Sequence, residues 1–227
     1  MDQLYSPEAA ASADALDALA GVAAQQGAHR IFLRVALESR VLEPARTAGF
    51  MPYATECLML AARPQAERSS LTLRLTTRTD MHGLFQLYNR VVPQNVRAAE
   101  AVTLEEWVAT RNPIGAQDPV QFVADYEGEI AAWVRTAQNG PAATFDVLVD
   151  PSSSDRTSSV AAAVCALFAG GNGVRAFVPS YMESFAYELE RRGFDRGAEF
   201  ALLARQLAKP VGELKPAKVA EEAAWIT

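Results

Sequence analysis

Two stretches of this sequence end in the same way, with a glycine and a phenylalanine that close a helical pattern. In each stretch an apolar run comes first, a helical pattern follows, and the glycine–phenylalanine pair then precedes a second apolar run. The pairs are Gly49-Phe50 and Gly193-Phe194. Glycine adopts the left-handed conformation that ends many helices, and an aromatic side chain after it can pack beneath a sheet. Two copies with matching surroundings predict a duplicated unit of helix, strand, helix and strand.

The first copy occupies the N-terminal part of the chain. Apolar periodicity and capping signals predict alternating elements there, namely helix 7–27, strand 31–35, helix 38–48 and strand 53–61. The polar stretch 64–70 contains a proline and follows a complete strand, which predicts a linker. We therefore expect residues 1–63 to form a partial unit and residues 71–208 to form a complete domain.

The remainder of the chain predicts a longer series of elements. Their order is strand 71–75, helix 79–91, a short helix that opens at 102–107, strands 120–126, 130–136 and 143–149, a helix to Ala169, strand 174–178, helix 181–192, strand 200–207 and a tail helix over 209–227. Thr79 and Asp80 predict the cap of one helix, and Thr103 and Glu106 have the spacing of a capping box. The three consecutive strands predict hairpins, because turn sequences such as Asn139-Gly140 separate them.

This order of elements over residues 71–207 resembles the GNAT (N-acetyltransferase) superfamily. Val149-Asp150-Pro151 matches the Val-x-Pro that ends the family's fourth strand. The family's next loop begins with arginine or glutamine and continues x-x-Gly-x-Gly or x-x-Gly-x-Ala; Arg156 and Ala161 match its ends, and Ser159 replaces its first glycine. The resemblance implies an α/β (α+β) fold with a mixed, mostly antiparallel sheet flanked by helices. The partial unit is then a half-GNAT fragment in a tandem arrangement.

The resemblance implies acetyl-CoA as the cofactor, with its pyrophosphate at the start of the helix after the fourth strand. A helix N-terminus suits an anion because its first amides have no partner within the helix and the dipole is positive there. The implied cofactor-binding residues are Val149, Arg156, Thr157, Ser158, Ser159, Val160 and Ala161. Asp155 adds a negative charge at this terminus, and serines also cap ordinary helices, so a purely structural role stays open.

The family's chemistry is the attack of an amine on a thioester, which needs a base for the ammonium and an acid for the leaving thiolate. The family's acid is a tyrosine five residues before the phenylalanine of the Gly-Phe pair. Leu189 stands there, and Ala45 stands there in the first copy, and neither can donate a proton. Tyr181 and Tyr187 in the same helix are candidate substitutes, Tyr187 being our choice. Asp146 is the candidate base that we choose, with Glu127 and Glu129 as alternatives. Structural roles for the two tyrosines and Asp146 stay open.

His82 and Trp133 are the candidate residues for the acceptor, which the resemblance implies is a small-molecule or peptide amine. A surface histidine and a core tryptophan are the alternatives. Two functions follow for the whole chain. The first is a GNAT-like acyl-CoA-dependent N-acetyltransferase with a degenerate CoA loop, and the second is a non-catalytic GNAT-like binding or assembly protein. The strands of the partial unit need a sheet to join, so they either extend the domain's sheet or pair across a homodimer.

Charge and composition exclude other classes. The net charge of −6 provides no domain-wide basic surface for nucleic acid. The longest apolar run, 160–169, is too short for a membrane-spanning helix, which needs about 20 residues. The N-terminus has no secretory signal pattern, so we expect a cytoplasmic protein in which Cys57 and Cys165 are reduced and buried. No histidine shares a ligand-spaced cluster with a cysteine, so we expect no metal site.

Overall fold

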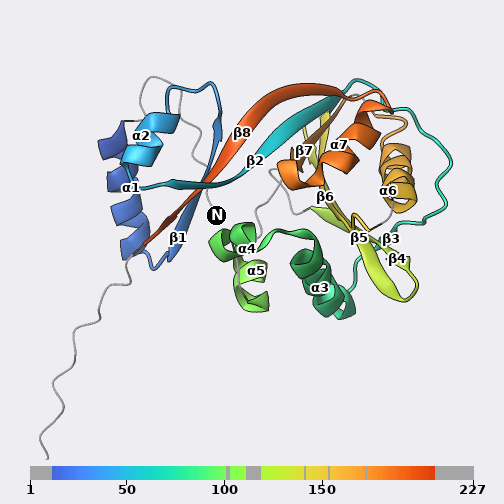
Figure 1. Ribbon diagram of the computed structural model, residues 1–227, viewed down its shortest axis with the longest axis horizontal. Coiled ribbons are helices and arrows are strands. Elements are labelled where there is room, and N and C mark those ends of the chain that lie inside the picture. The colour runs from blue at the N-terminus through green and yellow to red at the C-terminus, as the bar shows by residue number, and fades with distance from the viewer. Residues whose placement is uncertain are drawn as a thin grey trace, which may run out of the picture.

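The computed structural model describes residues 12–100, 103–110, 119–140, 142–152, 154–171 and 173–207. In this part of the chain eight strands form one sheet in the order β1-β8-β2-β7-β6-β5-β4-β3 (Figure 1). The strands are β1 Arg30–Ala36, β2 Met51–Ala61, β3 Arg74–Leu75, β4 Val120–Tyr126, β5 Glu129–Asn139, β6 Ala142–Val149, β7 Val174–Pro179 and β8 Asp195–Gln206. Neighbouring strands are antiparallel except β6 and β7, which are parallel. The predicted mixed, mostly antiparallel sheet is confirmed.

Helices cover both faces of this sheet. They are α1 Ala13–Gln25, α2 Leu42–Thr47, α3 Met81–Val91, α4 Gln94–Glu100, α5 Leu104–Thr110, α6 Ser154–Leu167 and α7 Glu183–Glu190, with 3-10 turns η1 Arg78–Asp80 and η2 Ser180–Met182. Phe145 of β6 packs against Phe168 and Phe194, which follow α6 and α7. Trp133 of β5 packs against Trp107 of α5. Trp133 pairs with Leu148, whose side chain alternates with that of Phe145, so α6 and α7 cover the face opposite to α3–α5.

The two glycine–phenylalanine pairs have the same local structure. Gly49 and Gly193 adopt φ angles of 80° and 85°. The amide of Phe50 donates to the carbonyl oxygen of Ala45 at 3.0 Å, and the amide of Phe194 donates to that of Leu189 at 3.2 Å. Both phenylalanines are buried. In each helix the amide of the phenylalanine thus bonds to the carbonyl oxygen five residues before it, which is typical of a helix that ends at a glycine. The duplication of the whole unit stays a prediction.

The strands of the N-terminal segment join the same sheet as the rest of the chain. β8, from the C-terminal part of the chain, lies between β1 and β2. β8 pairs with β1 on one side and β2 on the other, and β2 continues to pair with β7. Figure 1 shows β2 and β8 as long curved strands that connect α1 and α2 at one end with α6 and α7 at the other. The small core beneath α1 and α2 includes residues from both parts of the chain, namely Leu16, Val35, Ala45, Ala48, Phe50, Ala201 and Leu203. The sheet thus crosses the predicted division between residues 63 and 71, which itself stays a prediction.

The segment 64–70, predicted to be a linker, packs against α6 and α7. The amide of Gln65 donates to the carbonyl oxygen of Arg192 at 2.9 Å, and the Glu67 carboxylate lies 2.9 Å from the Arg192 guanidinium. The Ser69 hydroxyl donates to the carbonyl oxygen of Ser159 at 2.7 Å. These contacts attach the connection between β2 and β3 to the helical layer.

Two local expectations differ from the structure near α3. The capping box there uses Thr77 with Asp80, because η1 precedes the helix, and Thr79 is not the cap. α4 follows directly after Pro93, where no helix was expected. By contrast, the Thr103–Glu106 capping box is confirmed, since each backbone amide donates to the other side chain at 3.2 Å. The predicted tail helix 209–227 lies outside the described residues.

Cys57 and Cys165 are both buried and unbridged, as expected from the sequence. No helix in the described ranges combines the length and the apolar character needed to cross a bilayer.

Candidate functional site

The parallel pair β6 and β7 separates part of the way along its length. Pairing extends from Ala143 with Val174 to Phe145 with Ala176, although β6 continues to Val149 and β7 to Pro179. The amide of Asp150 donates toward β5, to the carbonyl oxygen of Ala131 at 2.9 Å. Because backbone groups alternate sides along a strand, the amide of Val149 points the other way, into the opening between β6 and β7. The sheet therefore offers backbone donors and acceptors at this splay.

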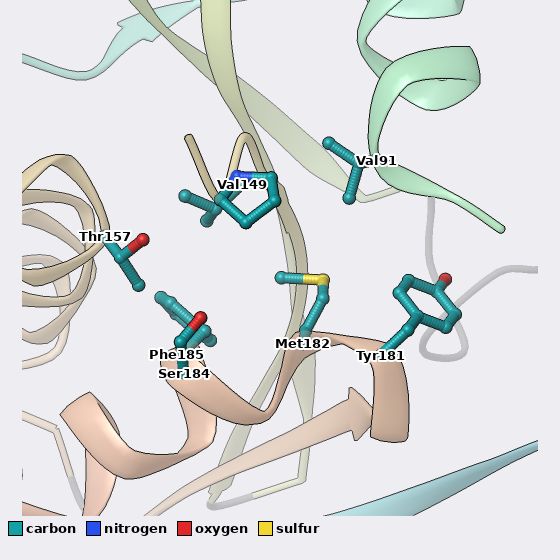
Figure 2. Close-up of a pocket in the computed structure, with 8 residues that line it drawn as sticks. Val91, Val149, Thr157, Tyr181, Met182, Ser184 and Phe185 are labelled. Carbon is teal, nitrogen blue, oxygen red and sulfur yellow. The ribbon is translucent and has the colours of Figure 1, made fainter. Parts of the chain in front are cut away.

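A small depression lies at the carboxyl end of β6. It encloses about 210 Å³, part of it open solvent, and it is lined by Val91, Val149, Pro151, Thr157, Tyr181, Met182, Ser184 and Phe185. Apart from Pro151, in the turn after β6, these residues come from α3, β6, α6, η2 and α7, so the depression forms where these five elements meet. Figure 2 shows Thr157 on one side and Tyr181 on the other, with Met182 between them. The lining is largely apolar and carries three hydroxyl groups.

Beside the depression, four side chains form what we call the acid–tyrosine cluster: Tyr53, Tyr88, Glu100 and Tyr181. The Tyr88 hydroxyl donates to Oε2 of Glu100 at 3.3 Å, and the Tyr53 hydroxyl also hydrogen-bonds this carboxylate. Tyr181 interacts electrostatically with Glu100 and Tyr88. The cluster draws on β2, α3, the end of α4 and η2. Tyr181 belongs to both the cluster and the lining of the depression, so it connects them.

Glu100 differs from the other carboxylates in this region. Glu56 forms an ion pair with Arg34, and Asp146 forms one with Arg135. For Glu100, by contrast, the described part of the chain shows hydrogen bonds from tyrosine hydroxyls and no ion pair. Burial raises the pKa of both Glu56 and Glu100, and of these two Glu100 is the one whose carboxylate forms no ion pair in the described residues.

Burial governs the protonation of this cluster. It raises the pKa of Glu100 above the ordinary 4.5, since the hydrogen bonds from Tyr88 and Tyr53 offset burial only in part and the charge of Glu56 adds to it. Burial, followed by the nearby Glu100 charge, also raises the pKa of Tyr53, Tyr88 and Tyr181 well above 10. The cluster therefore combines a carboxylate that is a stronger base than usual, that of Glu100, with tyrosine hydroxyls that stay protonated at neutral pH.

Solved structures show what this arrangement is similar to. A protein of the GNAT family from Novosphingobium aromaticivorans matches at TM-score 0.53 and 14% identity, over 84% of this chain and 81% of that one. A GCN5-related N-acetyltransferase from Anabaena variabilis matches at TM-score 0.51 and 10% identity, over 86% and 50%. A conserved protein of unknown function from Staphylococcus epidermidis matches at TM-score 0.56 and 12% identity, over 86% and 79%.

The protein has the GNAT fold. At these identities the similarity concerns the fold alone. This chain spans 50% of the Anabaena variabilis protein. No family model and no curated protein sequence matches the chain. The chemistry of this GNAT fold therefore has to be argued from its own residues.

The two residues predicted to be catalytic lie on opposite sides of the sheet. Asp146 is on the α3–α5 face, where Nε of Arg135 donates to its Oδ1 at 2.8 Å and Nη2 to its Oδ2. Tyr187 lies on α7, on the other face, and its side chain is 58% exposed. The structure does not bring them together at the depression. Leu189, at the position of the family's tyrosine, is fully buried.

The predicted cofactor residues divide into two groups. Val149 and Thr157 line the depression. The others follow the start of α6, which begins at Ser154, earlier than the family's loop would allow. The amides of residues 158–161, which include Ser158, Ser159, Val160 and Ala161, therefore lie in the second turn and bond within the helix. The side chain of Arg156 is 16% exposed and bonds to Asp150 and Ser152.

The predicted acceptor residues lie apart from the depression. His82 is exposed on α3 and hydrogen-bonds Gln86 at 3.0 Å. Trp133 is 4% exposed, packs against Trp107, and donates from its indole nitrogen to Gln121 at 3.2 Å. Both positions agree with the structural roles that the sequence left open. Within the described ranges, no group of three or more histidine, cysteine, aspartate or glutamate side chains is arranged to hold a metal ion.

Sequence reasoning missed Glu100, Tyr53 and Tyr88. Glu100 was missed together with its helix, because Pro93 was interpreted only as the end of α3. Proline is equally typical of a first helical turn, and the amide of Arg97 does donate to the carbonyl oxygen of Pro93 at 3.0 Å. That signal could have revealed α4. Nothing local in the sequence brings Tyr53, in β2, next to a helix that starts forty positions later.

Proposed function

We propose that this protein is an N-acyltransferase that moves an acyl group from a thioester, such as that of acetyl-CoA, to an amine of a small molecule or peptide. The observation that carries this proposal is the position of Tyr181, which lies in the depression at the β6–β7 splay and in the cluster around Glu100. A proton donor, Tyr181, thus lines the opening, and it interacts with a proton acceptor, Glu100, in the neighbouring cluster. Acyl transfer to an amine needs both.

The residues around the depression fit the acyl and thiol end of acetyl-CoA. Val149 and Phe185 provide apolar contacts, Thr157 provides a hydroxyl, and the splayed backbone of β6 can bond an extended amide-containing arm. Acetyl-CoA, when bound, supplies an activated acyl carbon and a thiolate leaving group. The depression is far smaller than the 300–1,000 Å³ that is typical of ligand pockets, so it would admit at most the end of one arm of a larger molecule.

In this proposal Glu100 accepts the proton of the acceptor's ammonium, and Tyr181 donates a hydrogen bond to the leaving thiolate. The raised pKa of Glu100 makes its carboxylate a stronger base, and the raised pKa of Tyr181 keeps its hydroxyl protonated. A proton transfer to a positioned base such as Glu100 contributes about 10²–10⁴-fold to the rate of a catalysed reaction.

The test is to incubate the purified protein with acetyl-CoA and a panel of primary amines while following the release of free thiol. We expect amine-dependent thiol release. Absence of turnover with every amine, together with absence of acetyl-CoA binding by calorimetry up to millimolar concentration, would contradict the proposal.

A second candidate is a non-catalytic GNAT-like binding or assembly protein. The observation that favours it is the pairing of Arg156 with Asp150, which occupies the side chain that the family would use for pyrophosphate. This candidate predicts calorimetric binding of a thioester or a thiol without turnover of any amine, and the same two measurements distinguish the two candidates.

A further inference from the structure

A buried carboxylate, that of Asp150, lies in the turn that leads into α6 and pairs with Arg156 of its first turn. Asp150, directly after β6, is 6% exposed and accepts a hydrogen bond from the amide of Ser152 at 3.0 Å. Its carboxylate lies 2.9 Å from Nε of Arg90 and 3.3 Å from Nη1 of Arg156. Burial opposes its ionisation, but the Ser152 bonds and the two guanidinium charges outweigh burial and lower the pKa of Asp150. A carboxylate charge is therefore fixed beside the helix N-terminus at neutral pH.

Several contacts hold Arg156 in place. Besides Asp150, its Nη1 donates to the Ser152 hydroxyl at 3.1 Å, and its guanidinium lies over the ring of Tyr126 with 4.2 Å to the centroid. Turning this side chain toward a phosphate would give up the stacking contact and leave the buried Asp150 with less compensation.

The serines of the predicted loop also face other parts of the protein. The Ser158 hydroxyl accepts a hydrogen bond from Arg192 at 3.0 Å. The Ser159 hydroxyl lies 2.8 Å from that of Ser70, in the segment packed against α6. Neither hydroxyl is available at the start of the helix.

The charges near this end of α6 do not favour a further anion. The guanidiniums of Arg90 and Arg156 face the carboxylate of Asp150, and Arg90 also pairs with Glu129 at 3.3 Å. Asp155 adds an exposed carboxylate in the first turn. A pyrophosphate would approach a region where the carboxylates of Asp150, Glu129 and Asp155 outnumber the guanidiniums of Arg90 and Arg156.

From these contacts we infer that the protein binds the acyl-pantetheine part of its donor and leaves the nucleotide part without specific recognition. The inference rests on the proposed function and defines its donor as a class: acyl thioesters of pantetheine-type thiols, with or without an attached nucleotide. S-acetylpantetheine is then used about as well as acetyl-CoA.

Calorimetry of the full chain with CoA and with pantetheine tests this inference without requiring turnover. We expect the two dissociation constants to agree within about threefold, the contribution of a single net hydrogen bond. The ratio of kcat/KM for acetyl-CoA and S-acetylpantetheine should agree within the same factor. A preference for CoA of about 100-fold or more would overturn the inference while leaving the proposed function intact.

Arg156→Ala provides a second measurement that compares ligands within one variant, so any loss of stability affects both titrations. We expect the CoA-to-pantetheine ratio to stay as in the unmodified protein. A selective loss of CoA binding would show that Arg156 contacts the nucleotide part and would overturn the inference. If neither ligand binds the unmodified protein, both the proposed function and this inference are contradicted.

Discussion

Glu100 shows how position determines the chemistry of a side chain. Glu56, Asp146 and Glu100 lie near one another, and the first two have arginine partners. Glu100 receives its hydrogen bonds from tyrosines, whose hydroxyls carry no charge to hold the carboxylate ionised. Burial therefore has the largest effect on the pKa of Glu100, as it also has on that of Glu56, which is raised in spite of Arg34.

Glu100→Gln should reduce kcat/KM by about 100-fold or more, because the amide keeps the shape of the carboxylate but cannot accept a proton. In the unmodified protein kcat/KM should fall as the pH decreases through the raised pKa of Glu100, above 4.5, and this acidic limb should disappear in the variant. Steady-state kinetics across pH is the measurement. Glu38→Gln, at an exposed turn residue, is the control and should leave the profile unchanged.

The raised pKa of Glu100 also predicts the direction in which Glu100→Gln changes the free energy of unfolding. Because the folded protein holds the Glu100 proton more tightly than the unfolded chain does, ionisation costs stability as the pH rises through the unfolded and then the folded pKa. At pH 7 the variant avoids that cost, so its unfolding free energy should equal or exceed that of the unmodified protein. A variant that is inactive and also strongly destabilised at pH 7 would indicate a structural role instead.

Two tyrosines compete for the role of hydrogen-bond donor. Tyr181→Phe should reduce kcat by about tenfold or more with little change in the KM for the acceptor, since only the hydroxyl is removed. Tyr187→Phe should change neither constant, because that side chain is 58% exposed on the outside of α7. Steady-state kinetics of both variants decides the matter, and the opposite pattern would favour the sequence-based choice of Tyr187.

At the scale of single elements, the two glycine-terminated helices predict matched effects. Gly49→Ala and Gly193→Ala should each destabilise the fold by about 1 kcal/mol, because φ angles of 80° and 85° are unfavourable for alanine even though a methyl group meets no atom closer than 3.7 Å. Denaturant unfolding measures both.

Gly21→Ala is the contrasting control for these glycines. Gly21 lies inside α1 with open space around it, so alanine should stabilise the protein by about 0.5–1 kcal/mol through helix propensity. The same substitution thus has opposite signs according to the backbone conformation. Destabilisation at Gly21, or none at the other two positions, would contradict this account.

Arg192 connects three elements through one side chain that is 5% exposed. It bonds Glu188 on α7, the Ser158 hydroxyl on α6 and Glu67 in the segment before β3. Arg192→Ala should cost about 3 kcal/mol or more, because Glu188 loses its buried partner and keeps only the exposed Arg191 and the Ser158 hydroxyl. Its neighbour Arg191 is 61% exposed, and Arg191→Ala should cost less than about 1 kcal/mol. If urea unfolding showed equal losses of unfolding free energy for the two variants, the buried Arg192 would contribute no more to stability than the exposed Arg191.

The effect of Arg192→Ala should also depend on pH. Burial alone would raise the pKa of Glu188, but the hydrogen bond and charge of Arg192 lower it overall. The stabilisation therefore exists above the unfolded pKa of Glu188 and is lost as the pH falls toward the folded one. The difference between the variant and the unmodified protein should shrink in acid.

At the scale of the whole molecule, the pairing of β8 with β1 and β2, and of β2 with β7, makes the two parts of the chain interdependent. Without β2, both β7 and β8 lose a neighbouring strand, and β8 also supplies Ala201 and Leu203 to the core under α1 and α2. An unpaired strand edge of this length is prone to aggregate. β1 lies at the outer edge of the sheet, and a homodimer through the partial unit stays a prediction.

Expression of residues 71–227 without residues 1–70 tests this interdependence. We expect the fragment alone to aggregate or to lack a cooperative thermal transition, and we expect the two co-expressed fragments to copurify and unfold together. Circular dichroism and size-exclusion chromatography provide the readouts. A cooperative transition of the isolated 71–227 fragment would instead support the independent domain that the sequence predicts.

Local patterns predicted much of the fold correctly. The strand 120–126 coincides with β4, the Thr103–Glu106 capping box forms, and both Gly-Phe pairs close their helices. The candidate site was less accessible to sequence reasoning. Val149 and Thr157, which the sequence predicted to be cofactor-binding residues, line the depression. The bonding of Arg156 to a buried aspartate depends on tertiary packing and could not be predicted.

The sequence by itself determined most of the elements and the Thr103–Glu106 cap, because these depend on side chains within a few positions of one another, although α4 and the Thr77 cap were not predicted. The tertiary structure decided which strands are neighbours in the sheet, since the order β1-β8-β2 joins segments from the two ends of the chain. It also decided the chemistry of Glu100. The pKa of a carboxyl group depends on burial and on neighbouring charges, and those around Glu100 come from β2, α3 and η2, which are separated along the chain and adjacent only when the sheet has formed.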